Sequence, residues 1–191
     1  MTYCGMRKLA ATVALVLATG PVLAHPLSDA IAAEGGMICF SRTYNAAWLK
    51  AHPGQTVREV KLAITDTTTF RLSLLGARKP LYVYGSCGWE EMAGNMNIPT
   101  FKPTAGVWCD MMKDVTGSWS EEVGGFPIDW GNGRTIELHL DDYLVAWRSY
   151  DVRRYATRPS LHAADRILRL NRVPPSACRV LVTKFAPEDI L

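Results

Sequence analysis

Apolar and polar side chains alternate in a series of short runs, and this alternation constrains the fold more than any other feature. In the first run Val60, Leu62 and Ile64 alternate with Lys61 and Ala63. A period of two residues is typical of a β-strand with one face in a core. The runs that we expect to form strands are 60–64, 70–74, 81–89, 107–110, 136–140 and, less regularly, 167–170.

Turn-forming residues separate these runs, as at 66–69, at 76–80 and at Gly131-Asn132-Gly133. Asn-Gly favours the positive φ angles of a tight hairpin. Short strands with such turns predict a mainly β fold, an antiparallel sandwich or a small barrel. A short N-terminal helix is expected over 46–51, capped by Asn45, and a helical turn is expected after Pro174-Pro175.

The N-terminus has the layout of a signal peptide. Arg7 and Lys8 precede an apolar run over 9–17, and Val22-Leu23-Ala24 offers small residues for cleavage. The run is short for a retained membrane anchor, which is the alternative. We therefore expect a signal peptide at 1–24, a flexible leader at 25–36 and a single β-rich domain at 37–191. The mature protein should be soluble, periplasmic or secreted, and without a transmembrane segment.

Four cysteines remain once the signal is removed, namely Cys39, Cys87, Cys109 and Cys178. An even number in an exported chain predicts two disulfides, and four cysteines allow three pairings. We favour Cys87–Cys109, which would link two neighbouring strands, and Cys39–Cys178, which would tie the ends of the domain together. A zinc site would need close-set pairs such as C-x-x-C, and the sequence has none.

Charge is nearly balanced overall but divided unevenly along the chain. The net charge is +3, which becomes +1 without the two basic residues of the signal, so nothing indicates a nucleic-acid partner. The segment 148–191 has nine basic and four acidic residues. Such asymmetry indicates either an anionic partner or compensation by neighbouring segments in the sheet, and both interpretations stay open.

Three aromatic residues lie opposite the aliphatic face of their runs, namely Tyr82, Tyr84 and Trp108. Aromatic side chains exposed on a rigid sheet suit contact with a protein or a carbohydrate. The alternative is that a second layer or a helix covers this face. The pattern does not choose between the two.

One histidine suggests a metal. If cleavage follows Ala24, His25 becomes the first residue, and its imidazole and terminal amine can chelate copper with a second histidine such as His139. This N-terminus resembles the start of exported copper carriers and copper monooxygenases. Otherwise His139 is expected to be exposed on the polar side of its strand, and no cofactor is expected.

No catalytic motif stands out. The stretch Gly117-Ser118-Trp119-Ser120 does not have the spacing of a G-x-S-x-G elbow. The adjacent pair Asp141-Asp142 would point to opposite faces of a strand and rarely forms an acid–base couple. A hydrolase remains an alternative only with a site assembled from scattered residues by the fold.

Short motifs spread over most of the mature chain resemble small exported proteins of proteobacteria with a four-cysteine, β-rich body. These motifs are Cys39-Phe40-Ser41-Arg42, Tyr44-Asn45-Ala46-Ala47, His52-Pro53-Gly54-Gln55-Thr56-Val57, Cys87-Gly88-Trp89 and Ala177-Cys178-Arg179. That family has no known function, so the resemblance implies export and the cysteine framework but no catalytic residue. We expect a monomeric binding or envelope-associated protein without catalytic activity.

Overall fold

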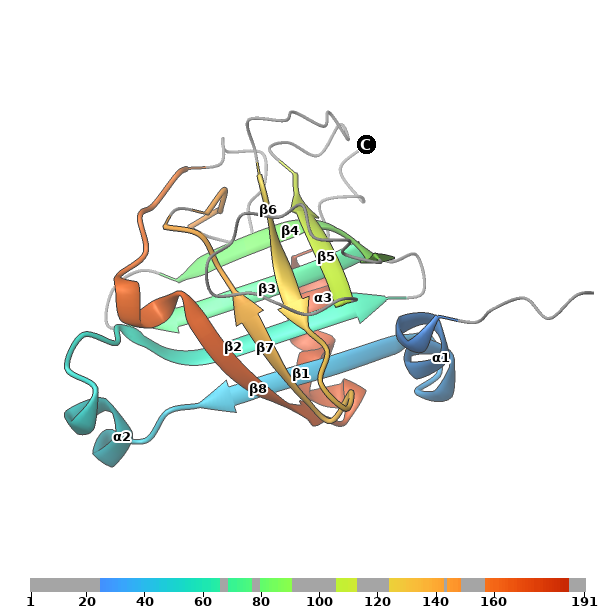
Figure 1. Ribbon diagram of the computed structural model, residues 1–191, viewed down its shortest axis with the longest axis horizontal. Coiled ribbons are helices and arrows are strands. Elements are labelled where there is room, and N and C mark those ends of the chain that lie inside the picture. The colour runs from blue at the N-terminus through green and yellow to red at the C-terminus, as the bar shows by residue number, and fades with distance from the viewer. Residues whose placement is uncertain are drawn as a thin grey trace, which may run out of the picture.

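The protein forms an eight-stranded antiparallel β-barrel in a computed structural model (Figure 1). The structure describes residues 25–65, 69–76, 80–90, 106–112, 124–142, 144–148 and 157–185. The expected signal peptide at 1–24 lies outside these residues. Each strand pairs with the next along the chain, and β1 pairs with β8 to close the barrel. Of the two predicted architectures, the barrel is confirmed and the sandwich is not.

Six of the eight strands, all but β1 and β6, follow the predicted runs closely. They are β1 (Met37–Thr43), β2 (Val57–Thr65), β3 (Thr69–Gly76), β4 (Leu81–Glu90), β5 (Gly106–Met111), β6 (Gly125–Asp129), β7 (Thr135–His139) and β8 (Ile167–Val173). The turn between β6 and β7 has Gly131 and Gly133 at positive φ, as the Gly-Asn-Gly motif predicts. The alternation of the sequence becomes an alternation between the inside and the outside of the barrel.

Large apolar side chains fill the barrel interior. The rings of Phe70 and Phe126 meet edge to face with centroids 5.4 Å apart, and Phe40 lies in the same buried cluster. Eight strands enclose a space that side chains can fill. Among the described residues, the interior is therefore a packed core.

Strands β1 and β6 were not expected from the periodicity. In β1 the outward-facing Cys39 is as buried as the inward-facing Phe40, because the C-terminal region covers the outer wall there. In β6 the sequence contains Gly125 and Pro127, which both disfavour strands. Burial on both faces and two strand-breaking residues remove the alternation signal.

Residues 25–36 form a helix and not the flexible leader that we expected. Helix α1 (Pro26–Ala33) buries Leu27 and Ile31, one helical turn apart, in the barrel core. Arg172 on β8 donates to the Ala30 carbonyl at 3.0 Å and pairs with Glu34 at 3.2 Å. The helix thus closes one end of the barrel.

The first end of the barrel, where α1 lies, is also filled by indole rings. Trp89 and Trp130 meet edge to face with centroids 6.3 Å apart, and Trp130 also contacts Phe40. At the other end of β1 lies helix α2 (Ala46–Ala51), where Asn45 accepts a hydrogen bond from the Trp48 amide as predicted (Figure 1). The two ends of the barrel are therefore built differently.

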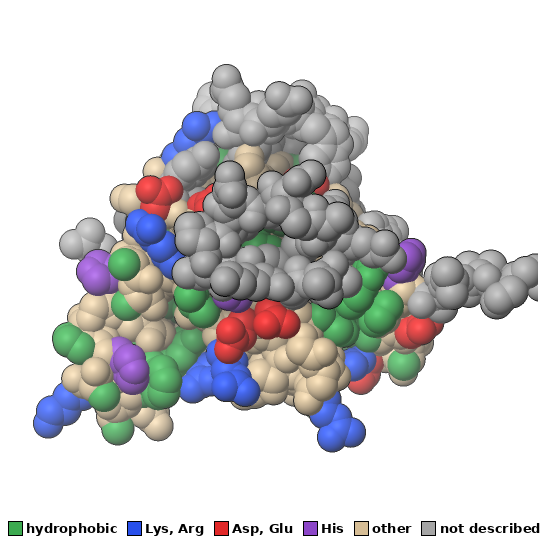
Figure 2. Space-filling view, in the orientation of Figure 1, with side chains coloured by type: hydrophobic (Ala, Val, Ile, Leu, Met, Phe, Trp, Pro, Cys, Tyr) green, Lys and Arg blue, Asp and Glu red, His purple; other side chains and the backbone are tan. Residues whose placement is uncertain are grey.

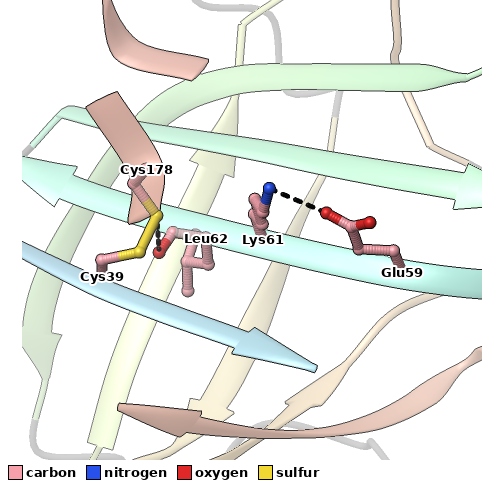
Figure 3. A network of polar contacts seen from close by, with 5 residues as sticks. All are labelled: Cys39, Glu59, Lys61, Leu62 and Cys178. Carbon is pink, nitrogen blue, oxygen red and sulfur yellow. Dashed lines mark hydrogen bonds and ion pairs between the residues drawn. A yellow bond between two sulfur atoms is a disulfide. The ribbon is translucent and has the colours of Figure 1, made fainter. Parts of the chain in front are cut away.

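The C-terminal region covers the outer wall of the barrel. The 3₁₀-helix η2 (Pro175–Cys178) and helix α3 (Arg179–Lys184) confirm the predicted helical turn. Figure 3 shows the disulfide Cys39–Cys178 that joins η2 to β1, beside an ion pair of 2.8 Å between Lys61 and Glu59 on β2. This disulfide anchors the C-terminal region to the wall.

The second disulfide, Cys87–Cys109, crosses directly between β4 and β5. The two residues are register partners, their Cα atoms are 4.1 Å apart, and both side chains lie in the core. Both predicted pairings are therefore confirmed. No helix in the described part of the chain is long and apolar enough to cross a membrane.

Gly85 provides a test of the packing. A Cβ on Gly85 would lie 1.8 Å from the Asp110 carbonyl oxygen and 2.6 Å from Cε1 of Phe70. Gly85→Ala should lower the free energy of unfolding by about 3 kcal/mol or more, because neither the strand nor the ring has room to move. Urea denaturation measures it. The control is Gly88→Ala on the same strand, where no atom lies within 4 Å of the added Cβ. Equal stability of the two variants would contradict this packing.

The two disulfides should differ in their contribution to stability. Cys39–Cys178 closes a sequence separation of 139 residues, and Cys87–Cys109 one of 22. In the chain-entropy treatment these loops correspond to about 5 and about 3 kcal/mol. Urea denaturation of the two double Cys→Ala variants should show the larger loss for Cys39 and Cys178. An equal or reversed order would show that loop entropy does not dominate.

Candidate functional site

A cavity of about 480 Å³ lies at the second end of the barrel, away from α1. The lining residues come from the ends of β2, β3 and β4 and from the segment before β8. They are Thr56, Val57, Leu74, Gly76, Leu81, Arg148, Pro159, Ser160, Leu161 and His162. We call this space the mouth cavity. Its volume lies within the range of about 300–1,000 Å³ that is usual for small-molecule sites.

The floor of the mouth cavity is apolar. Val57, Leu74 and Leu81 belong to the buried core cluster, and each stands at the end of a strand. They form the last inward-facing layer before the barrel opens. A ligand in the cavity would therefore place apolar surface against the floor, where its transfer from water is favourable.

We call the part of the lining formed by Arg148 and residues 159–162 the rim of the mouth cavity. Backbone pairing between two segments holds the rim in place. Ala146 and Thr157 exchange two backbone hydrogen bonds of 2.9 and 2.8 Å, and the Leu161 amide donates to the Asp142 carbonyl at 2.6 Å. Trp147 in turn exchanges two backbone hydrogen bonds with Tyr82 at the start of β4. These contacts place Arg148, Ser160 and His162 around the cavity.

Asp165 fastens the rim to β2. This residue is completely buried in the 3₁₀-helix η1 (Ala163–Asp165). Its carboxylate accepts from the Thr56 hydroxyl at 2.6 Å and from the amides of Thr56 and Val57 at 3.0 Å each. Hydrogen bonds to a charged acceptor are the stronger ones, and these join segments 109 residues apart. Asp165 therefore holds the two sides of the mouth together.

His162 has a defined orientation at the rim. Its Nδ1 accepts a hydrogen bond from the Ala164 amide at 3.4 Å, so the proton of the neutral ring lies on Nε2. Gly54 leaves room for the ring, since a Cβ there would lie 2.7 Å from Cε1 of His162. His162 thus presents an N–H donor at the cavity.

These contacts do not build a hydrolytic relay. In a Ser-His-Asp triad the carboxylate accepts a proton from the histidine ring and orients it. Here the Asp165 oxygens accept from Thr56 and Val57, and a backbone amide donates to Nδ1 of His162. Ser160 and His162 line one cavity, but among the described residues the contacts of Asp165 and His162 do not have the arrangement of such a triad.

The aromatic face predicted from the sequence is divided between buried and partly exposed residues. Tyr82 and Tyr84 are only 6% exposed each, because Leu181 of α3 and Phe185 pack over them. Of the two interpretations that the sequence left open, the covering helix applies to these tyrosines and the exposed aromatic surface does not. The same burial raises the pKa of Tyr84, against the opposing effect of Arg71.

Trp108 remains partly exposed on the outer face of β5. Its indole lies over Gly125 of β6, where a Cβ would come within 2.8 Å of the ring. Its Nε1 donates to Asp110 at 2.7 Å. One face of the ring is therefore used in packing, and the N–H is already paired.

Among the described tryptophans Trp48 is the most exposed, and its ring is also engaged by neighbouring side chains. The His52 ring stacks on it at 4.0 Å with an interplanar angle of 13°, and the Arg42 guanidinium lies 5.0 Å from the ring centroid. Its Nε1 donates to Gln55 at 2.8 Å. These contacts join α2 to β1 and engage the Trp48 ring and its N–H.

The two residues of the copper hypothesis lie at opposite ends of the barrel. His25 precedes α1 at the first end, whereas His139 closes β7 at the second end. The His139 side chain is only 9% exposed, so its predicted exposure is wrong, and burial lowers its pKa. Among the described residues, no group of three or more His, Cys, Asp or Glu is arranged to hold a metal.

A second, shallower hollow of about 280 Å³ lies on the outside of the barrel. It is lined by Asp129, Gly131, Asn132, Thr135, Glu137 and Arg169. Glu137 and Arg169 are register partners on β7 and β8, and Figure 2 shows acidic and basic side chains side by side over these strands. Opposite charges adjoin here, as expected if neighbouring segments compensate one another.

Comparison with known proteins returns no relative. No protein-family model matches the chain, and neither a curated protein nor a solved structure is significantly similar to it.

Sequence reasoning did not identify the residues of the mouth cavity. Arg148 is the first residue of the basic segment 148–191, and this excess of positive charge was the one feature of the sequence that indicated a role for it. His162 carries no local motif, and Thr56 and Asp165 are 109 residues apart. Only closure of the barrel brings them together.

Asp165→Asn tests how the mouth is held. The amide group would turn a donor toward the N–H and O–H donors of Thr56 and Val57, so the free energy of unfolding should fall by about 2 kcal/mol or more. Urea denaturation measures the change. Asp142→Asn, at an exposed carboxylate nearby, is the control and should change it by less than about 0.5 kcal/mol. A small effect of Asp165→Asn would remove the assigned role.

Proposed function

We propose that this chain is an exported protein that binds a small molecule in the mouth of its barrel. The observation that carries the proposal is the cavity of about 480 Å³, with an apolar floor and polar groups at its rim. Mouths of β-barrels are among the places where small-molecule sites occur most often. Among the described residues, the interior is packed with side chains and α1 covers the first end, so the mouth is where we place the ligand.

The rigidity of the surroundings supports binding. The floor residues belong to the core, and the rim is held by Asp165 and by backbone pairing to β4 through Trp147. A site that is ordered before the ligand arrives loses less conformational entropy on binding. The cavity is therefore suited to bind without rearrangement of the barrel.

Export is part of the proposal. The layout of residues 1–24 is that of a signal peptide, and disulfides persist mainly in oxidising compartments. The pairings Cys39–Cys178 and Cys87–Cys109 are compatible with an extracellular or periplasmic protein. We place the ligand in that compartment.

The proposal changes where the ligand is expected. The aromatic residues of β4 are packed beneath α3, and Trp108 is engaged with Gly125 and Asp110. The mouth cavity offers enclosed apolar surface that the outer wall does not. A small molecule therefore fits the described geometry better than a carbohydrate on an aromatic face.

Ser160→Trp tests this function. Ser160 is exposed at the rim, so an indole there can fill the cavity without entering the core. The fluorescent apolar probe N-phenyl-1-naphthylamine should bind the unmodified protein saturably, and Ser160→Trp should weaken its binding by about tenfold or more, since tenfold is only about 1.4 kcal/mol.

The matched control is Val180→Trp, on the exposed side of α3 and outside the cavity lining. It should leave the dissociation constant of the probe unchanged. Absence of saturable binding, or equal binding by both tryptophan variants, would contradict a ligand site in the mouth.

A further inference from the structure

The charge in the described lining of the mouth cavity comes from Arg148. Arg148 and His162 are in its lining, and no Asp or Glu is among the described lining residues. The remaining polar side chains there are the hydroxyls of Thr56 and Ser160. The lining therefore combines an apolar floor with a rim that supplies hydrogen-bond donors and positive charge.

Arg148 is available to a ligand. It is exposed, and within the described residues its guanidinium has no hydrogen bond or ion pair. Its position after Trp147 is set by the backbone pairing of Trp147 with Tyr82. A guanidinium presents a planar fork of N–H groups that matches the two oxygens of a carboxylate.

His162 provides a second donor on the same rim. Because the Ala164 amide occupies Nδ1, the N–H of the neutral imidazole is at Nε2. Gly54 and the pairing of Asp165 with Thr56 keep this part of the rim in place. In this arrangement the ring has a donor, and not an acceptor, left for a ligand.

The buried carboxylate of Asp165 does not offset the positive charge that Arg148 brings to the cavity. The Asp165 carboxylate is outside the cavity lining, and its oxygens accept from Thr56 and Val57. Asp142 is exposed and contributes its backbone carbonyl to Leu161, not its side chain to the lining. The groups that face the cavity remain those of Arg148, His162 and the two hydroxyls.

We propose that the ligand is an amphipathic carboxylate, with an aliphatic or ring-bearing tail on the floor of the mouth cavity and its carboxylate at Arg148 and His162. This inference rests on the proposed function and names the chemical class that the site selects. The tail would contact Val57, Leu74 and Leu81, and the head group would lie at the rim where the donors are. A neutral molecule with the same tail would leave the donors without a charged partner.

The experiment compares two competitors that differ only in the head group. Decanoate and 1-decanol share a ten-carbon chain, and each is titrated against N-phenyl-1-naphthylamine bound to the full mature protein. The concentration of decanoate that displaces half of the probe should be at least about tenfold below that of decanol. A charge-assisted hydrogen bond contributes more than about 1.4 kcal/mol, which corresponds to that factor.

Arg148→Gln tests the assignment of the head group. This variant should weaken decanoate binding about tenfold and leave probe and decanol binding within about twofold, since it removes the charge but keeps an amide of similar reach. The matched control is Arg134→Gln, which removes an exposed arginine in the turn between β6 and β7 at the first end of the barrel. It should leave decanoate binding unchanged.

The outcomes separate the inference from the function. If the probe binds but decanoate and decanol compete equally, or if Arg148→Gln and Arg134→Gln act alike, the carboxylate preference is wrong and the binding function stands. If neither the probe nor either competitor binds, both are wrong. A preference for decanoate that disappears only in Arg148→Gln supports both.

Discussion

Closure of the barrel by β1 and β8 is the constraint on which the rest of the structure depends. The first and last strands pair at Cys39 with Val173, Phe40 with Arg172 and Ser41 with Asn171. A closed sheet has no unpaired edge, so the backbone groups of every strand find partners within the barrel. Closure also means that side chains from all strands share one interior, which is the core. The strands do not cover the two ends of the barrel, so other parts of the chain have to do so.

The two ends of the barrel are covered by different segments of the chain, and the candidate site lies at the second end. At the first end α1 inserts Leu27 and Ile31 beside Trp89, and apolar contact fills the space. At the second end the segment before β8 lines the mouth, and the buried Asp165 holds it against β2. The mouth cavity lies at this second end.

The C-terminal region changes the meaning of the aromatic residues on the outer wall. The Cys39–Cys178 disulfide brings η2 onto the wall, and Phe185 then packs against Tyr82, Tyr84 and Trp147. The buried Arg71 donates to the Phe185 carbonyl at 2.8 Å. The alternation alone is compatible with a binding surface here, but these side chains form a second, smaller core. The candidate ligand site lies instead at the mouth of the barrel.

Local patterns in the sequence determined the strands with clear alternation, the helix capped by Asn45 and the turn at Gly131-Asn132-Gly133, because each depends on neighbouring residues. The sequence allowed three disulfide pairings and favoured the two that the structure confirms. The sequence did not reveal whether the sheet closes, whether Tyr84 is covered, or that Arg148 and His162 share a cavity. Only the tertiary structure decided these points, because each depends on contacts between residues far apart in the chain, for which local periodicity carries no signal.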